Sequence, residues 1–102
     1  MANGANHDLV RGYKQRNFWL METQPGRVDW VPINRALDPG QLREMAWQAV
    51  AHGADAILYW QWRPAANGQE TYHGAILGQD GEPNPIQPEI AKTANELTKA
   101  AP

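Results

Sequence analysis

The stretch that decides the fold runs from Asp38 to Trp60 and reads DPGQLREMAWQAVAHGADAILYW. Asp38 and Pro39 are typical of the first residues of a helix, and Gln41 stands at the spacing of a capping box. Gly53 is a typical helix stop, and the apolar run that ends at Trp60 is typical of a buried parallel strand. The stretch therefore predicts a helix followed by a strand. The helix positions expected to face inward are Leu42, Met45, Ala46, Ala49 and Val50.

Two further helices are expected, one on each side of this stretch. Residues 7–14 read as the end of a helix, with Leu9 and Val10 facing inward and charged residues facing outward. A last helix is expected to begin near Pro88, since proline suits the first helical position. The positions of this last helix expected to face inward are Ile90, Ala91, Ala94 and Leu97.

A second apolar strand precedes the deciding stretch. Residues 18–21 read Phe-Trp-Leu-Met, a short aromatic-rich run typical of a buried parallel strand. Two long polar loops, residues 23–37 and 63–84, follow the two strands, and loops of this length tend to carry function. The alternation predicts an α/β fold with about two parallel βα units. Because open strand edges need cover, we expect either a piece of a larger barrel or copies that associate.

Composition and charge exclude several classes of protein. The 102 residues make one domain at most, and a hydrophobic content of 42% is that of a globular protein. Lys and Arg number 9 against 11 Asp and Glu, a formal charge of -2, so we expect no nucleic-acid or membrane partner. Cysteine is absent from the sequence. The first residues lack the apolar core of a secretory signal, and we therefore expect a soluble, cytoplasmic protein.

Glu22 directly follows the first apolar strand. Barrel enzymes keep their catalytic groups at the C-terminal mouth of parallel strands. A retaining glycosidase uses two carboxyl groups, roughly 5 Å apart: one attacks the anomeric carbon and the other protonates the leaving oxygen. Glu22 has the position of the attacking group. A single glutamate after a strand is more often a surface residue or a cap, and the position alone leaves that interpretation open.

Three tryptophans lie near the predicted strand ends. Trp60 and Trp62 are two residues apart, so an extended strand would turn both toward one face, with Gln61 opposite. An aromatic ring at such a place can form a platform for a sugar, although packing in the core is the commoner role. Trp30 lies in the first loop, where a large ring indicates either ligand contact or packing beneath the loop itself.

Glu70 and His73 are three residues apart in the second loop, so one helical turn would bring both side chains to one face. Together they offer the donors and acceptors that adjacent sugar hydroxyls require. Glu-x-x-His also occurs in di-iron proteins. Here no second motif supplies the remaining ligands, since His7 lies elsewhere and His52 is expected to interact with the C-terminus of its own helix. We therefore expect no metal and no cofactor.

Taken together, these segments resemble glycoside hydrolase family 42 β-galactosidases. The resemblance runs from His7 to about Leu97, and the order and spacing of its motifs are specific. It implies that residues 1–102 are the C-terminal portion of a catalytic (β/α)8 TIM barrel, namely strands seven and eight with their helices. The matching motifs are His7–Gly12, Phe18–Gly26, Val28–Trp30, Trp47–Ala54, Trp62–Arg63 and Glu70–Ala75.

The resemblance implies a β-galactoside sugar as substrate, from which the family removes terminal galactose with retention of configuration. Glu22 matches the family's nucleophile on strand seven. Trp30 matches a loop tryptophan that packs against the bound sugar. Trp60 stands where many members have Phe, so that an aromatic wall is kept in a bulkier form.

The second loop carries the remaining positions that the resemblance assigns to substrate. Glu70 and His73 match the pair that holds the galactose hydroxyls in the subsite of the cleaved residue. Arg63 follows strand eight in the family pattern and is given only a supporting role.

The sequence departs from the family in one large respect. The family's general acid/base is a Glu preceded by Asn at the end of strand four, and Asn95-Glu96, the only such pair here, lies in the last predicted helix. Positioned acid catalysis is worth roughly 10² to 10⁴ in rate, and the family uses Glu70 for binding instead. We therefore expect the isolated chain to be inactive or nearly so.

Three hypotheses follow from the sequence. The first is a fragment of a β-galactosidase that retains half of the active site. The second is a self-assembling quarter barrel, in which copies supply the missing strands. The third is a carbohydrate-binding or structural module without turnover, which would use Trp30, Trp60, Glu70 and His73 to hold a sugar.

Overall fold

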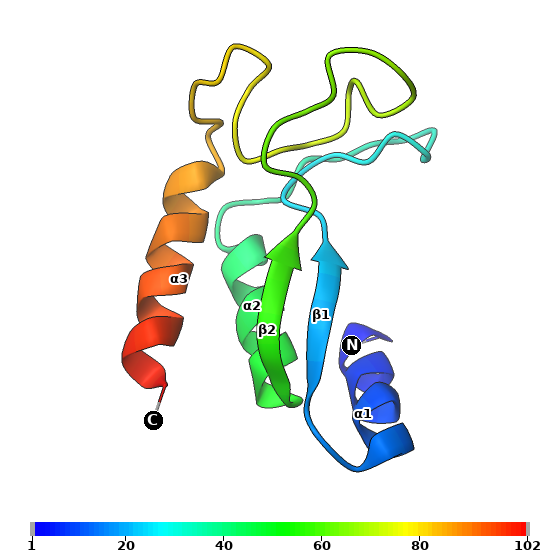
Figure 1. The fold of residues 1–102 in the computed structure, drawn as a ribbon, viewed down its shortest axis with the longest axis vertical. Helices are drawn as coiled ribbons and strands as arrows, with labels where there is room; N and C mark the ends of the chain where they lie inside the picture. Colours follow the sequence, from blue (N-terminus) through cyan, green and yellow to red (C-terminus); the bar gives the residue numbers. More distant parts are fainter. Residues whose placement is uncertain (1, 102) are drawn as a thin grey trace.

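The structure, a computed structural model, describes residues 2–101, which form three helices and two strands in alternation (Figure 1). The helices are α1 (Ala2–Lys14), α2 (Gln41–Ala51) and α3 (Gln87–Ala100). The strands are β1 (Phe18–Thr23) and β2 (Ala54–Tyr59). The predicted order of helices and strands is therefore confirmed. No helix in this part of the chain is long and apolar enough to cross a membrane.

The two strands lie side by side and run parallel, as the sequence predicts. Phe18 pairs with Ala54 at one end of the sheet and Thr23 with Tyr59 at the other. Beyond the last pair, the N–H of Trp60 donates to the carbonyl oxygen of Thr23 at 2.9 Å. Because both strands end at the same edge, the long loops that follow them gather there (Figure 1).

The sheet has one covered and one open face. Leu20 and Ile57 are cross-strand neighbours on the face toward α2, and they line one cavity with the buried Leu42 of that helix. Alternation turns Trp19 and Met21 to the other face, and each is 63% exposed. Parallel sheets are normally covered on both faces. The face that carries Trp19 and Met21 therefore lacks a packing partner within residues 2–101.

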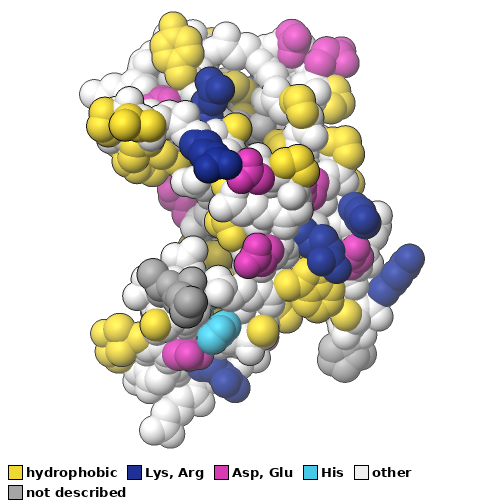
Figure 2. All heavy atoms as spheres, turned by 180° about the vertical axis from the view of Figure 1, so that it is seen from behind, with side chains coloured by type: hydrophobic (Ala, Val, Ile, Leu, Met, Phe, Trp, Pro, Cys, Tyr) yellow, Lys and Arg dark blue, Asp and Glu magenta, His cyan; other side chains and the backbone are white. Residues whose placement is uncertain are grey.

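Figure 2 shows the side of the molecule on which α2 lies. Hydrophobic side chains appear there in separate groups among charged ones rather than as one continuous apolar face.

On α1, Leu9 is 55% exposed and Val10 is 47% exposed, so the prediction that they face inward is wrong. The inward contacts of α1 come from its small and polar residues instead. Oδ1 of Asp8 and Nδ1 of His52 lie within hydrogen-bond distance at 2.6 Å, and Gly4 lies close beneath the same imidazole.

The first turn of α2 is preceded by a tight turn. The N–H of Gln41 donates to the Asp38 carbonyl, and the Asp38 N–H donates to Oε1 of Gln41, both at 3.0 Å. Half of the predicted capping box is therefore present: the Gln41 side chain accepts the Asp38 N–H, but Asp38 contributes its backbone carbonyl rather than its side chain. The helix itself begins at Gln41, so the placement of Pro39 at its first position is wrong by two residues. Gly40 has a φ of 87°, a conformation that favours glycine and separates the turn from the helix.

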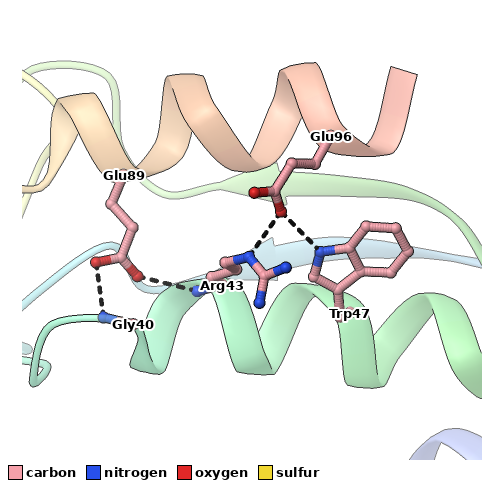
Figure 3. A network of polar contacts seen from close by, with 5 residues as sticks. All are labelled: Gly40, Arg43, Trp47, Glu89 and Glu96. Carbon is pink, nitrogen blue, oxygen red and sulfur yellow. Dashed lines mark hydrogen bonds and ion pairs between the residues drawn. The ribbon is translucent and has the colours of Figure 1, made fainter. Parts of the chain in front are cut away.

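A carboxylate from α3 caps α2 (Figure 3). Glu89 accepts the N–H of Gly40 at 2.9 Å and the N–H of Arg43 at 3.0 Å, two amides that the helix itself cannot satisfy. Further along, Glu96 accepts from Nε of Arg43 at 2.6 Å and from the indole of Trp47 at 3.2 Å. The hydrogen bond from Arg43 lowers the pKa of Glu96, with the Trp47 bond adding to the effect.

The face of α3 toward α2 is a polar stripe. Glu89, the buried Thr93 and Glu96 recur at i, i+4 and i+7, and they hold this face against α2. Ala91 is exposed, so its predicted inward placement is wrong, whereas Ala94 lines a cavity that α3 shares with α2 and β2. The other two residues of α3 that were predicted to face inward, Ile90 and Leu97, are half-buried beside this stripe.

The end of α2 is as predicted at Gly53, which has a φ of 100°. Its N–H donates to the Val50 carbonyl at 2.9 Å, and its own carbonyl accepts from Phe18 at 3.1 Å, at the start of β1. The prediction that the His52 side chain interacts with its own helix end is wrong. That imidazole pairs with Asp8 of α1, which joins the first helix to the second.

Candidate functional site

The two long loops enclose a hollow beyond the carboxyl ends of the strands. Its volume is about 450 Å³, within the range of small-molecule sites. Four of the predicted site residues line it: Glu22, Trp30, Trp60 and His73. They come from β1, from the loop after β1 and from the loop after β2. The parallel pairing of the strands is what brings these distant parts of the sequence together.

Glu22 contributes an unengaged carboxylate to the hollow. Its position in β1 is exposed, and no other side chain in residues 2–101 holds it through a hydrogen bond or ion pair. Thr23 and Gln24, its neighbours in sequence, line the same hollow and surround it with neutral polar groups. A carboxylate in this state is available to attack an electrophilic carbon or to accept a hydrogen bond.

Trp30 and His73 form one wall. Their ring centroids lie 5.0 Å apart with the ring planes tilted by 43°. Trp30 is 64% exposed, whereas His73 is 3% exposed. The Nδ1 atom of His73 is buried without a hydrogen-bond partner from the described residues. Buried ring nitrogens are normally paired, so this atom is a group that a bound hydroxyl can engage.

Trp60 also lines the hollow and is joined to Glu70, which is not among the residues that line it. The indole Nε1–H of Trp60 donates to Oε2 of Glu70 at 3.0 Å. A carboxylate has acceptor sites on both oxygens, so Glu70 retains one oxygen for a ligand. The N–H of His73 donates to the Glu70 carbonyl at 3.2 Å, so the turn expected from their spacing is present, although only His73 of the pair lines the hollow.

Trp62 and Arg63 lie outside the hollow. The carbonyl of Trp62 accepts the N–H of Leu77 at 2.8 Å, and the Arg63 guanidinium donates to the carbonyl of Gln79. The prediction that Trp60 and Trp62 share a face is wrong because β2 ends at Tyr59, so strand alternation does not extend to Trp62. The Trp60–Gln61 peptide bond is cis. Arg63 braces the second loop from outside the hollow, and its supporting role toward the substrate stays a prediction.

The sequence analysis missed four polar residues of the hollow: Asn3, Thr23, Gln24 and Gln41. Thr23 and Gln24 follow Glu22 along the same segment, and that adjacency was the one available signal. Asn3 and Gln41 come from the first turns of α1 and α2, which only the folded chain brings to the strand ends. Within residues 2–101 no group of three or more His, Asp or Glu side chains could hold a metal ion.

Side-chain contacts brace the first loop internally. The N–H of Val28 donates to Oδ1 of Asn34 at 3.3 Å, and Nδ2 of Asn34 donates back to the Val28 carbonyl. Val28 is 6% exposed and Pro25 is fully buried. The loop is therefore packed at its base, and Trp30 projects from a supported backbone.

Comparison with known proteins gives a consistent assignment. The sequence profile of glycoside hydrolase family 42, described as beta-galactosidase, matches residues 1–100. The chain is 47% identical over 92 residues to a beta-galactosidase of Haloferax lucentense. The aligned region covers 90% of this chain and 14% of that protein. It is 41% identical over 96 residues to a beta-galactosidase of Thermus thermophilus, and the aligned region covers 94% of this chain and 15% of that protein.

Solved structures show the same similarity. The chain matches a beta-galactosidase from Bacillus circulans sp. alkalophilus with a TM-score of 0.88 and 39% identity, over 94% of this chain and 14% of that one. It matches the beta-galactosidase of Halorubrum lacusprofundi with a TM-score of 0.88 and 42% identity, over 93% of this chain and 14% of that one. The chain thus spans about one seventh of the length of these relatives.

Proposed function

Because this chain belongs to glycoside hydrolase family 42, we propose that it is the part of a catalytic (β/α)8 barrel that supplies strands seven and eight, with Glu22 as the nucleophile of a retaining β-galactosidase. One observation carries the proposal. The unengaged carboxylate of Glu22, at the end of a parallel strand, lines the same hollow as Trp30, Trp60 and His73. This is the position at which barrel enzymes do their chemistry.

The proposed mechanism is a double displacement at the anomeric carbon of a terminal β-galactoside. Glu22 attacks that carbon while the leaving oxygen is protonated, which gives a covalent galactosyl–enzyme. Water then releases galactose with its original configuration. The rings of Trp30 and Trp60 flank the sugar, and His73 and the remaining oxygen of Glu70 take hydroxyl hydrogen bonds.

The general acid is proposed to come from barrel segments outside this chain. Glu96 is held between Arg43 and Trp47 at the interface of α2 and α3 and does not line the hollow. Glu70 already accepts the indole of Trp60. Neither carboxyl group is therefore suited to protonating a leaving oxygen roughly 5 Å from the nucleophile. The relatives are about seven times longer than this chain and have room for the second carboxylate.

A ring of four copies is disfavoured by the number of helices. A (β/α)8 barrel has one helix for each strand, whereas residues 2–101 hold three helices and two strands. Four copies would bring α3 of one copy and α1 of the next to the same junction. The open sheet face is better completed by the rest of one barrel than by copies of this chain.

The test is a chimera in which residues 7–97 replace the matching segment of the Thermus thermophilus beta-galactosidase. We expect the chimera to hydrolyse a chromogenic β-galactoside, and Glu22→Gln to lower kcat by about 10⁴-fold or more, as removal of a nucleophile does. Glu44→Gln, on the exposed side of α2, is the matched control and should retain activity. Turnover that survives Glu22→Gln would exclude Glu22 as nucleophile, and sugar binding without hydrolysis in both forms would favour a binding module.

A further inference from the structure

The two loops that enclose the hollow touch at a pair of glycines. The N–H of Gly74 donates to the carbonyl of Arg27 at 2.7 Å, so the second loop is hydrogen-bonded to the first at this point. A Cβ atom on Gly74 would lie 2.6 Å from the nitrogen of Arg27 and 2.7 Å from Cα of Gly26. These are backbone atoms, which cannot rotate out of the way as a side chain would.

The contact demands space rather than an unusual backbone conformation. Neither Gly26 nor Gly74 is among the glycines with positive φ. The reverse substitution is milder, because a Cβ atom on Gly26 would lie 3.3 Å from Cα of Gly74. The side chains on both sides of the contact are buried: Pro25, Val28, His73 and Ala75. The loops therefore cannot separate slightly to admit a methyl group without disturbing this packed junction.

The glycine pair stands next to the two rings that form one wall of the hollow. Gly74 directly follows His73, and Gly26 precedes Trp30 by four residues in the same braced loop. The 5.0 Å separation of the two ring centroids thus depends on how closely the loop backbones approach. In Figure 1 these loops lie together above the ends of the strands.

We propose that Gly74 is a positioning residue, which sets the distance between the two loops and thereby holds His73 against Trp30 in the sugar-binding wall. This inference rests on the proposed function, because it takes the hollow to be the galactose site. Gly74 does not line the hollow. It acts through the backbone contact with Gly26 and the hydrogen bond to Arg27.

The first arm of the test is independent of sugar and uses the 102-residue chain. We expect a nuclear Overhauser effect between the rings of Trp30 and His73, with the Trp30 signals assigned by their loss in Trp30→Phe. Gly74→Ala should abolish this effect while the far-ultraviolet circular dichroism is kept. Gly26→Ala should weaken it less, as its milder contact predicts. Gly12→Ala is the matched control, since a Cβ atom there meets nothing within 4 Å, and should leave it unchanged.

The second arm measures substrate kinetics in the active chimera. Gly74→Ala should raise KM for the chromogenic β-galactoside at least tenfold with a smaller change in kcat, and Gly26→Ala should raise it less. The inference would be overturned if Gly74→Ala left both the ring contact and KM unchanged. It would also be overturned if Gly12→Ala changed kcat and KM as much as Gly74→Ala does. If Gly74→Ala fails to fold, the smaller changes in the ring contact and in KM expected for Gly26→Ala decide whether the inference holds. An inactive chimera would count against the proposed function, and the first arm would still decide the role of Gly74.

Discussion

The side chain of Glu70 is fixed by a single hydrogen bond from the Trp60 indole, at 3.0 Å. This bond gives Trp60 two roles, as an aromatic wall and as the donor that orients a carboxylate. The same residue type behaves differently elsewhere in the chain. Glu89 and Glu96 are held by α2, whereas Glu22 is held by no other side chain in the described residues. Position in the fold decides which glutamate is available for chemistry.

A prediction follows for Trp60→Phe, which keeps the ring and removes the donor. A hydrogen bond to a charged group is worth about 1.5–3 kcal/mol, so we expect KM of the active chimera to rise about 10-fold or more. The value of kcat should change little, because the Glu22 carboxylate is untouched. Trp62→Phe is the control, since Trp62 lies outside the hollow, and should leave KM unchanged. An unchanged KM in Trp60→Phe would show that Glu70 does not depend on this bond.

The sequence predicted part of the site and missed its internal contacts. Glu22 and Trp30 were found because strand ends and loops can be located from apolar runs. The pairing of Trp60 with Glu70 was not predictable, because it depends on how a loop of irregular backbone returns to the end of its own strand. Trp62 was placed wrongly for the same reason, since strand alternation applies only while the backbone stays extended.

At the scale of the element, the cap of α2 is supplied by another helix. Glu89→Ala removes the acceptor for the amides of Gly40 and Arg43, and we expect the free energy of unfolding to fall by about 1 kcal/mol, as for loss of an N-cap. Glu89→Gln retains one acceptor oxygen and should cost less. Urea denaturation followed by circular dichroism measures both changes. Glu82→Ala, at an exposed loop position, is the control, and an equal loss there would contradict the assignment.

The stability that the Arg43–Glu96 contact between α2 and α3 contributes should depend on pH. The pKa of Glu96 is lowered in the folded chain, chiefly by the hydrogen bond from Arg43, from its ordinary value of 4.5. The folded state therefore favours the ionised carboxylate, and this stabilisation is present above the ordinary pKa and is lost as the pH falls through the lowered one. We expect the wild-type chain to melt at a higher temperature than Glu96→Gln at pH 7, and the difference to vanish in acid. A difference that persists in acid would exclude charge as its cause.

The helices and strands were predicted better than their faces. Apolar periodicity located α2 and β2 because their burial is hydrophobic. The same rule misplaced Ala91 and missed the carboxylates of Glu89 and Glu96, through which α3 also meets α2 beside its apolar positions. A polar interface between helices cannot be distinguished from a solvent-facing stripe by hydropathy alone.

At the scale of the whole molecule, the open face of the sheet is the main unmet requirement. Trp19 and Met21 are exposed there, on a strand pair whose outer edges have no strand neighbour in residues 2–101. Parallel strands of this kind are covered in intact barrels. The isolated chain therefore carries an apolar surface that another part of a barrel, or another chain, would cover.

Self-association of the isolated chain is the expected consequence. We predict that its average mass, measured by light scattering, rises with concentration above that of one chain, and that Trp19→Lys lowers it by placing a charge on the open face. Tyr72→Lys is the control, because Tyr72 is exposed on the second loop away from the sheet. A monomer at all concentrations, in both wild type and variant, would show that the open face does not attract a partner.

The cap that Glu89 places on α2 also has a consequence for the order of synthesis. Glu89 follows Arg43 by 46 residues, so a ribosome completes α2 well before it makes the residue that caps it. At ~5–20 residues per second, the delay is on the order of 2 to 9 s. In that interval only the turn between Asp38 and Gln41 orders the start of the helix. The nascent segment thus waits with its first amides open to water, or to a chaperone, until α3 emerges.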